Sequence, residues 1–148
     1  MRATLTLLFL LTSPVWANPT LEIPPRNRVT LRSGKWTPSQ TQAEAAYESI
    51  QKFLQRPIVP QPYYVGQIAE ILKHRKQYRV QFIGIYRHGR KVIFCNFFPI
   101  RLPEEKQDET PYWRREIVDV MDGGFWYWRL DYDPQIDRSS NFTVNGYG

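Results

Sequence analysis

The chain has 148 residues, a formal net charge of +6 and one cysteine, Cys95. This length fits a single domain of ordinary size with its own hydrophobic core. A scaffold stapled by internal disulfides is excluded, so packing must stabilise the fold. Cys95 lies in an apolar stretch, which indicates a small buried residue; a reactive thiol and an intermolecular disulfide are the alternatives.

Residues 1–17 have the layout of a secretory signal peptide. Arg2 gives a positive start, residues 5–11 form an apolar run, and residues 15–17 form a cleavage site with small residues at the −3 and −1 positions. The apolar run is too short to span a bilayer. We expect cleavage after Ala17, which leaves 131 residues with a net charge of +5. The predicted location is secreted or periplasmic, with no membrane span after cleavage.

Residues 18–35 contain three prolines and no regular pattern, and are expected to form an extended arm before a single domain, residues 36–148. A helix is predicted over residues 38–55, with Thr37 as N-cap, Pro38 in the first turn and Gln40 completing a capping box. Apolar residues recur at spacings of three and four, so one side of this helix should face the core.

A β-hairpin over residues 78–99 is the clearest structural signal. Two runs of β-branched and aromatic residues flank His88-Gly89, which suits a tight turn. Pairing Arg87 with Arg90 places Phe82 opposite Cys95. Before the hairpin, residues 64–72 alternate well enough for a strand. After it, we expect a solvated loop over residues 103–110, strands over residues 113–121 and 125–132 joined by a turn at residues 122–124, and a short edge strand over residues 142–144.

One helix followed by four or five antiparallel strands predicts an α+β fold, with the sheet curled across the helix. This order of elements resembles the cystatin-like fold. The tail, residues 118–146, reads VDVMDGGFWYWRLDYDPQIDRSSNFTVNG. It resembles a group of uncharacterised exported bacterial proteins that end in a comparable Asp-Gly-Gly, aromatic strand, Tyr-Asp and Asn-Gly pattern. The resemblance implies a fold and carries over no activity.

The two faces of the hairpin are both apolar. The face with Val80 and Phe82 is expected against the helix, where Gly84 would let Tyr47 or Phe53 approach closely. The other face is too apolar to stay wet. Cover by the arm, by a second copy of the chain or by a protein partner is therefore predicted there. The residues of this candidate partner surface are Ile83, Ile85, Val92 and Phe94.

Basic residues gather at residues 73–79 and 87–91. The strand between the clusters separates them by about 30 Å at ~3.3 Å per residue, so they do not form one nucleic-acid groove. Solvated loop ends are one interpretation. Contact with an anionic partner, such as a surface polymer or phospholipid headgroups, is the other, with Arg87, Arg90 and Lys91 as the candidate anion contacts.

Carboxylates and histidines form no recognisable catalytic or metal motif. Asp119, Asp122, Asp131, Asp133 and Asp137 lack the spacing of an EF-hand. The same residues fix no carboxylate separation for glycoside hydrolysis. His74 and His88 lie in turns, away from zinc or triad motifs. We therefore expect no catalytic residue, metal or cofactor.

Trp126 and Trp128 share one face of the strand predicted over residues 125–132. They indicate either core packing or an aromatic platform for sugars or an aromatic partner. Asn141 begins an N-glycosylation sequon, in a position where a buried Phe142 would make it inaccessible.

Three classes of function follow. A small exported binding or interaction module of unidentified ligand is the prediction. A cystatin-type protease inhibitor is the first alternative, but that family carries Gln-x-Val-x-Gly in its first hairpin loop and Pro-Trp in its second, where this chain has KHRKQ at residues 73–77 and His88-Gly89. An enzyme is the second alternative, without a supporting residue pair.

Overall fold

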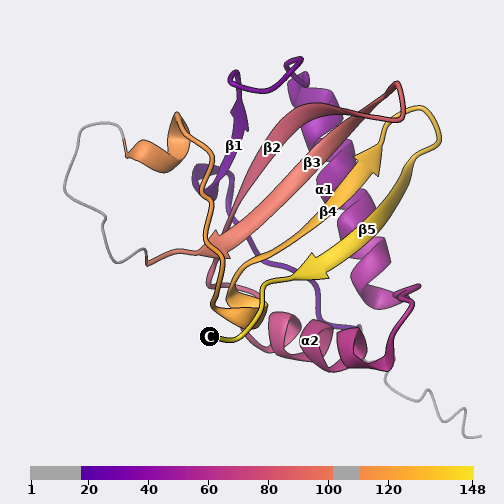
Figure 1. The fold of residues 1–148 in the computed structure, drawn as a ribbon, viewed down its shortest axis with the longest axis vertical. Helices are drawn as coiled ribbons and strands as arrows, with labels where there is room; N and C mark the ends of the chain where they lie inside the picture. Colours follow the sequence, from indigo (N-terminus) through magenta and orange to yellow (C-terminus); the bar gives the residue numbers. More distant parts are fainter. Residues whose placement is uncertain (1–17, 102–110) are drawn as a thin grey trace, which may run out of the picture.

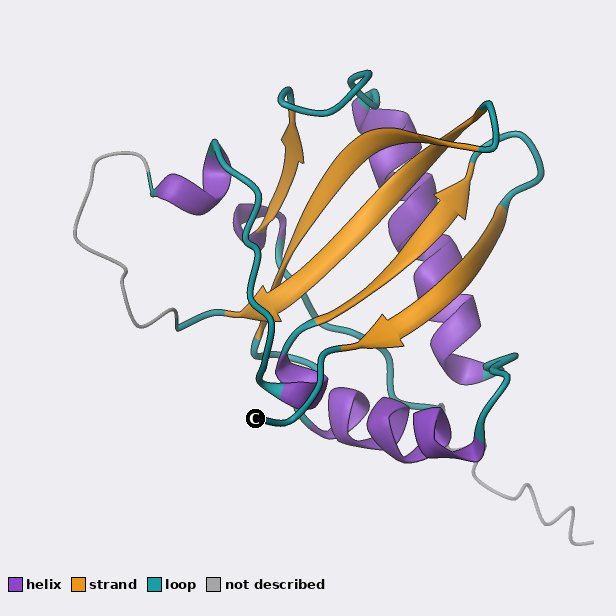
Figure 2. Ribbon diagram, in the orientation of Figure 1, coloured by secondary structure: helices purple, strands orange, loops and turns teal. Residues whose placement is uncertain are grey.

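The computed structural model describes residues 18–101 and 111–148. Within these ranges the chain has an α+β fold, as predicted, with two α-helices and a five-stranded mixed sheet in the order β1-β2-β3-β4-β5 (Figures 1 and 2). Helix α1 lies behind the sheet in Figure 1, and α2 runs along the end where β3 and β5 finish. The expected signal peptide and the expected loop over residues 103–110 lie outside the described residues.

Helix α1 spans Gln40–Gln55 and begins two residues later than predicted. Ser39 is the N-cap: its hydroxyl accepts from the Gln42 N–H at 3.2 Å, and its own N–H donates to the Gln42 amide oxygen at 2.9 Å. Both possible capping boxes fit the sequence. The later one forms because Trp36 bridges to Gly84 in extended backbone, which delays the first helical turn.

Helix α2 spans Pro62–Lys73, so the strand predicted over residues 64–72 is wrong. Pro62 occupies the first turn, where its missing N–H costs nothing. The apolar residues that alternate also recur at helical spacing, and the helix buries Ile68 and Ile71 against the core. Most of the remaining residues are good helix formers, which favours the helix over the strand.

The hairpin consists of β2, Tyr78–Arg87, and β3, Arg90–Pro99. Its predicted register is confirmed, with Phe82 opposite Cys95 and Arg87 opposite Arg90. His88 and Gly89 both have positive φ, 50° and 77°, as a two-residue hairpin turn requires.

Strand β1, Arg28–Leu31, follows the short 3₁₀ helix η1, Pro25–Asn27, and pairs in parallel with β2. The predicted all-antiparallel sheet is therefore wrong. A parallel partner is available because α1 and α2 form the crossover between β1 and β2. Residues 28–31 of the predicted arm thus form an edge strand of the sheet. Trp36, rather than Tyr47 or Phe53, fills the space at Gly84, where an added Cβ would meet the Trp36 backbone and ring.

The strand predicted over residues 113–121 is also wrong. The 3₁₀ helix η2, Tyr112–Arg114, leads into a segment without strand pairing that crosses the front of the sheet (Figure 1). The side-chain amides of Gln81 and Asn96 bond its backbone, so no neighbouring strand is needed.

A further 3₁₀ helix, η3, Gly124–Trp126, precedes β4, Trp128–Asp133. The predicted edge strand is confirmed as β5, Arg138–Val144, and is longer than expected.

The main core lies between α1 and the expected face of the hairpin. Ala46 and Ile50 of α1 pack in one buried cluster with Val80, Phe82 and Phe97. Cys95 is fully buried in the same cluster, which raises the pKa of its thiol.

The opposite face of the hairpin is covered largely by the chain itself. Phe98 packs there with Trp113 and Val118. These two residues belong to residues 111–120, which we call the covering segment and which the sequence did not suggest as cover. No helix in the two described ranges is long and apolar enough to cross a membrane.

Candidate ligand-binding site

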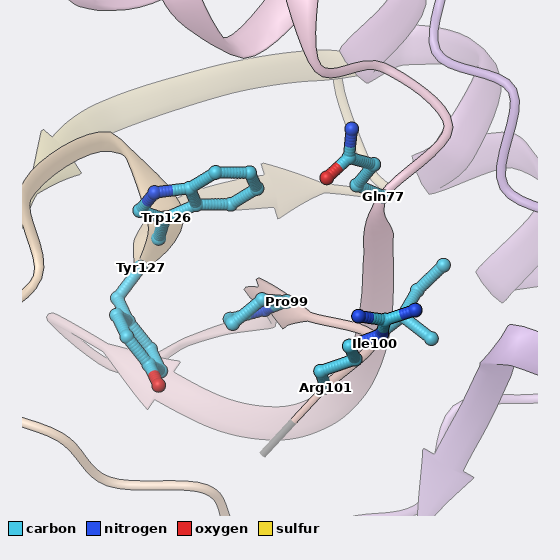
Figure 3. A pocket seen from close by; sticks show the side chains of 6 residues that line it. All are labelled: Gln77, Pro99, Ile100, Arg101, Trp126 and Tyr127. Atoms are coloured by element: carbon cyan, nitrogen blue, oxygen red, sulfur yellow. The ribbon is translucent and has the colours of Figure 1, made fainter. Parts of the chain in front are cut away.

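A pocket of about 720 Å³ opens at the base of the central hairpin, near the start of β4 (Figure 3). We call it the aromatic pocket. Figure 3 shows Trp126 and Gln77 on one side of Pro99 and Tyr127 on the other. Among the described residues, those that line it are Gln77, Pro99, Ile100, Arg101, Trp126 and Tyr127.

The hairpin brings half of this lining together. Gln77 immediately precedes β2, and Pro99 is the last residue of β3. The Ile100 N–H donates to the Gln77 carbonyl at 2.9 Å, which closes the base of the hairpin. Since the ladder ends by pairing Tyr78 with Pro99, Gln77 and Ile100 are adjacent by register.

Other aromatic rings pack against the Trp126 side chain. Its ring centroid lies 4.6 Å from that of His74 and 5.8 Å from that of Tyr78. The Tyr78 hydroxyl also donates to the Phe125 carbonyl at 3.0 Å, which fixes the backbone beside the indole. These contacts set the orientation of the indole before any ligand arrives.

Tyr127 is placed by a glycine turn. Gly123 has φ of +97°, and a Cβ added to it would lie 2.6 Å from the Tyr127 ring. The predicted turn between two strands is instead the start of η3, with Gly123 as its left-handed N-cap, and this backbone also makes room for the ring. Burial raises the pKa of Tyr127, and its neutral hydroxyl can donate a hydrogen bond.

The pocket therefore combines flat aromatic surfaces with the Gln77 amide and the Arg101 guanidinium. Aromatic faces bind apolar ring surfaces, and the amide and guanidinium provide hydrogen bonds around them. Such a mixture of mostly apolar walls with a few polar groups is typical of small-ligand sites.

The structure places the two residues of the predicted aromatic platform, Trp126 and Trp128, in different environments. Trp128 is 1% exposed and stacks on Phe97 with ring centroids 3.6 Å apart, so it belongs to the core. Trp126 lines the pocket because it lies in η3, outside the alternation of β4. Tyr127 takes the place of the second ring, and no sequence signal identified it.

The candidate partner surface is partly buried within the chain. Ile83 is 1% exposed and Val92 6%, whereas Ile85 and Phe94 are half-buried. Gly34 of the arm approaches Ile83 closely, so the arm provides some of the predicted cover.

Among the candidate anion contacts, Arg87 and Arg90 lie opposite each other in the hairpin, whereas Lys91 lies apart from them, over Trp36. Arg87 pairs with Asp131 at 3.0 Å and Arg90 with Asp133 at 2.7 Å. The Lys91 ammonium lies over the Trp36 ring, 5.4 Å from its centroid. At the other basic cluster, Arg75 and Lys76 pair with Glu22.

The remaining polar candidates do not converge. Asp119 and Asp122 are exposed, and Asp137 accepts a hydrogen bond from Tyr132. His74 packs on aromatic rings, and His88 forms the hairpin turn. Among residues 18–101 and 111–148, no group of three or more His, Cys, Asp or Glu side chains could hold a metal ion. The exposed Asn141 donates to Asp131 at 2.8 Å, while Phe142 is buried beside it.

The chain matches no known protein-family profile, no curated protein sequence and no solved structure.

Proposed function

We propose that the protein is a small exported binding module that recognises a saccharide in the aromatic pocket. The observation that carries this proposal is the fixed placement of Trp126 and Tyr127. Rings held by His74 and Tyr78 on one side, and by the Gly123 turn on the other, lose little conformational entropy when a ligand binds.

Saccharides fit the chemistry of this lining. The C–H face of a pyranose ring is apolar and flat, and it can stack on an aromatic side chain, while its hydroxyls need donors and acceptors at the edge. The Gln77 amide supplies both kinds of group, and Arg101 supplies donors. The volume of about 720 Å³ is within the ordinary range for small-ligand sites.

We also propose that the fold is a variant of the cystatin-like arrangement. The packing of the long helix α1 against strands β3, β4 and β5 supports this assignment. The parallel strand β1 and the second helix α2 are departures from the predicted pattern of one helix and an antiparallel sheet.

The test measures the affinity of the chain without residues 1–17 for maltohexaose, cellohexaose and chitohexaose. Tryptophan fluorescence and calorimetry monitor the binding. We expect at least one oligosaccharide to bind, and Tyr127→Leu to weaken it about tenfold, equivalent to about 1.4 kcal/mol. Tyr86→Leu is the matched control, because Tyr86 is 50% exposed at the opposite end of β2. Trp126→Leu should have an effect at least as large as Tyr127→Leu.

Two results would contradict the proposal. One is the absence of binding to all three oligosaccharides. The other is binding that Trp126→Leu and Tyr127→Leu leave unchanged although both variants are folded by circular dichroism. Inhibition of a papain-class protease by the unmodified chain would instead favour the inhibitor alternative.

A further inference from the structure

A second pocket lies at the opposite end of the sheet, where the β2–β3 turn and the β4–β5 turn meet. It has a volume of about 390 Å³, and we call it the tip pocket. Arg87 and Arg90 reach it from the first hairpin, and Arg138 reaches it from the start of β5. Its charged lining is completed by Asp131 and Asp133.

The two carboxylates are buried and already occupied. The Asp131 side chain is 4% exposed, and its Oδ2 accepts from Arg87 Nε at 3.0 Å and from the Asn141 amide at 2.8 Å. The Asp133 side chain is 11% exposed and pairs with Arg90 Nη2 at 2.7 Å, while its Oδ1 accepts the Gln135 N–H. Both carboxylates therefore already have cationic partners within the chain and do not form a cation site.

The same contacts leave other N–H donors of the Arg87 and Arg90 guanidiniums facing solvent. Arg87 uses Nε and Arg90 uses Nη2, and both side chains remain about half exposed, at 49% and 47%. A guanidinium carries five N–H donors, so each arginine keeps donors beyond its carboxylate contact. Buried carboxylates that hold guanidiniums in place lower the entropy cost of binding through the remaining donors.

Arg138 adds the third positive charge. It lies directly opposite Asp133 in the β4–β5 register and is exposed, while the two carboxylates pair with Arg87 and Arg90 instead. Three guanidiniums over two buried carboxylates give the lining a net charge of +1. Its outward groups are mainly donors, which matches an acceptor-rich anion.

We propose that the tip pocket binds a tetrahedral oxyanion, sulfate or phosphate, through Arg87, Arg90 and Arg138. The ion can be free or an ester on a small molecule, since both present the same oxygens. This site is independent of the aromatic pocket, and it replaces Lys91 with Arg138 among the anion contacts expected from the sequence.

Two single-charge variants separate this site from general attraction to a basic protein. Arg138→Gln removes a charge inside the pocket, and Lys91→Gln removes one nearby, over Trp36. Sodium sulfate, sodium phosphate and glucose 6-sulfate are titrated into each protein by calorimetry at constant ionic strength. Folding is checked by circular dichroism and by melting temperature without added anion.

We expect the original chain and Lys91→Gln to bind sulfate or phosphate alike, and Arg138→Gln to bind at least fivefold more weakly. Arg138→Lys keeps the charge, and its affinity should lie between those of the original chain and Arg138→Gln, because an ammonium lacks the bidentate geometry. Tighter binding of the ester than of free sulfate would identify an ester as the source of the anion. The proposal is overturned if neither ion binds above chloride, or if Lys91→Gln and Arg138→Gln weaken binding equally.

Discussion

The buried side chain of Gln81 holds the backbone of Val118 against the sheet, its Oε1 accepting the Val118 N–H at 3.0 Å. The same amide donates to the carbonyls of Trp113 and Glu116 at 2.6 and 2.7 Å. One side chain of β2 therefore satisfies three backbone groups of a segment that has no strand partner. This arrangement explains how residues 111–120 can cover an apolar face without joining the sheet.

Replacing Gln81 with leucine should destabilise the fold by about 2–4 kcal/mol, because three backbone groups would lose their partners in a buried site. Urea unfolding followed by circular dichroism measures this change. Gln135→Leu is the control, since Gln135 is exposed in the β4–β5 turn. Equal stability of Gln81→Leu and the original chain would show that water can replace the amide.

Gly123→Ala should disturb the aromatic pocket directly. The residue has φ of +97°, and the new Cβ would lie 2.6 Å from the Tyr127 ring. We expect a loss of about 1–3 kcal/mol in stability, together with weaker oligosaccharide binding. Chemical denaturation and the calorimetric assay for the aromatic pocket check the two effects.

Gly66→Ala is the matched control for this substitution. Gly66 lies inside α2, and an added Cβ would meet nothing within 4 Å. Alanine is the better helix former, so this variant should gain up to about 1 kcal/mol. If both glycine variants lost stability equally, the clash with Tyr127 would not be the cause.

The sequence predicts the parts of this fold that depend on neighbouring residues. The hairpin register follows from His88-Gly89 and the flanking β-branched residues, and it is confirmed throughout its length. The apolar period predicts helix α1, whose N-cap is Ser39 rather than the predicted Thr37, since both residues fit a capping box. For α2, the short apolar pattern fits both periods, and the strand was the wrong choice.

Elements that depend on distant contacts could not be predicted. Strand β1 is four residues long, and its partner β2 lies beyond both α1 and α2 in the sequence. The covering segment is extended because Gln81 and Asn96, more than twenty residues away, bond its backbone.

The same limit applies to the aromatic pocket. The end of the predicted ladder at Tyr78 and Pro99 placed Gln77 beside Ile100, so half of the lining was implicit in the hairpin. Tyr127 was not, because its position depends on where η3 ends and β4 begins.

Stability should fall at alkaline pH partly through Tyr132. Burial and the hydrogen bond to Asp137 raise the pKa of Tyr132 to about 12 from its ordinary value of 10.0. Between these two values the unfolded chain loses this proton more readily than the folded chain, so the free energy of unfolding decreases as pH rises from about 10 to about 12. Below pH 10 the contribution is fully present.

Tyr132→Phe should therefore be less stable than the original chain at neutral pH, by about 1 kcal/mol for the lost hydrogen bond, and should lose stability less steeply between pH 10 and 12. Urea unfolding at several pH values gives both quantities. Tyr63→Phe removes an exposed phenol and is the control for general alkaline effects. Parallel curves for Tyr132→Phe and the original chain would remove Tyr132 as a source of the dependence.

The Cys95 thiol should be inert in the folded protein. It is fully buried in the core between α1 and the sheet, and burial raises its pKa well above the ordinary value, so the reactive thiolate is scarce as well as inaccessible. Ellman's reagent at pH 8 should label Cys95 slowly, in proportion to the small unfolded population, and promptly in 6 M guanidinium chloride, roughly the range in which most domains are unfolded. Because Gln81→Leu lowers stability, it should speed labelling under native conditions in proportion to its unfolded population. Rapid labelling of the stable original chain would mean that the core opens locally around β3 without global unfolding.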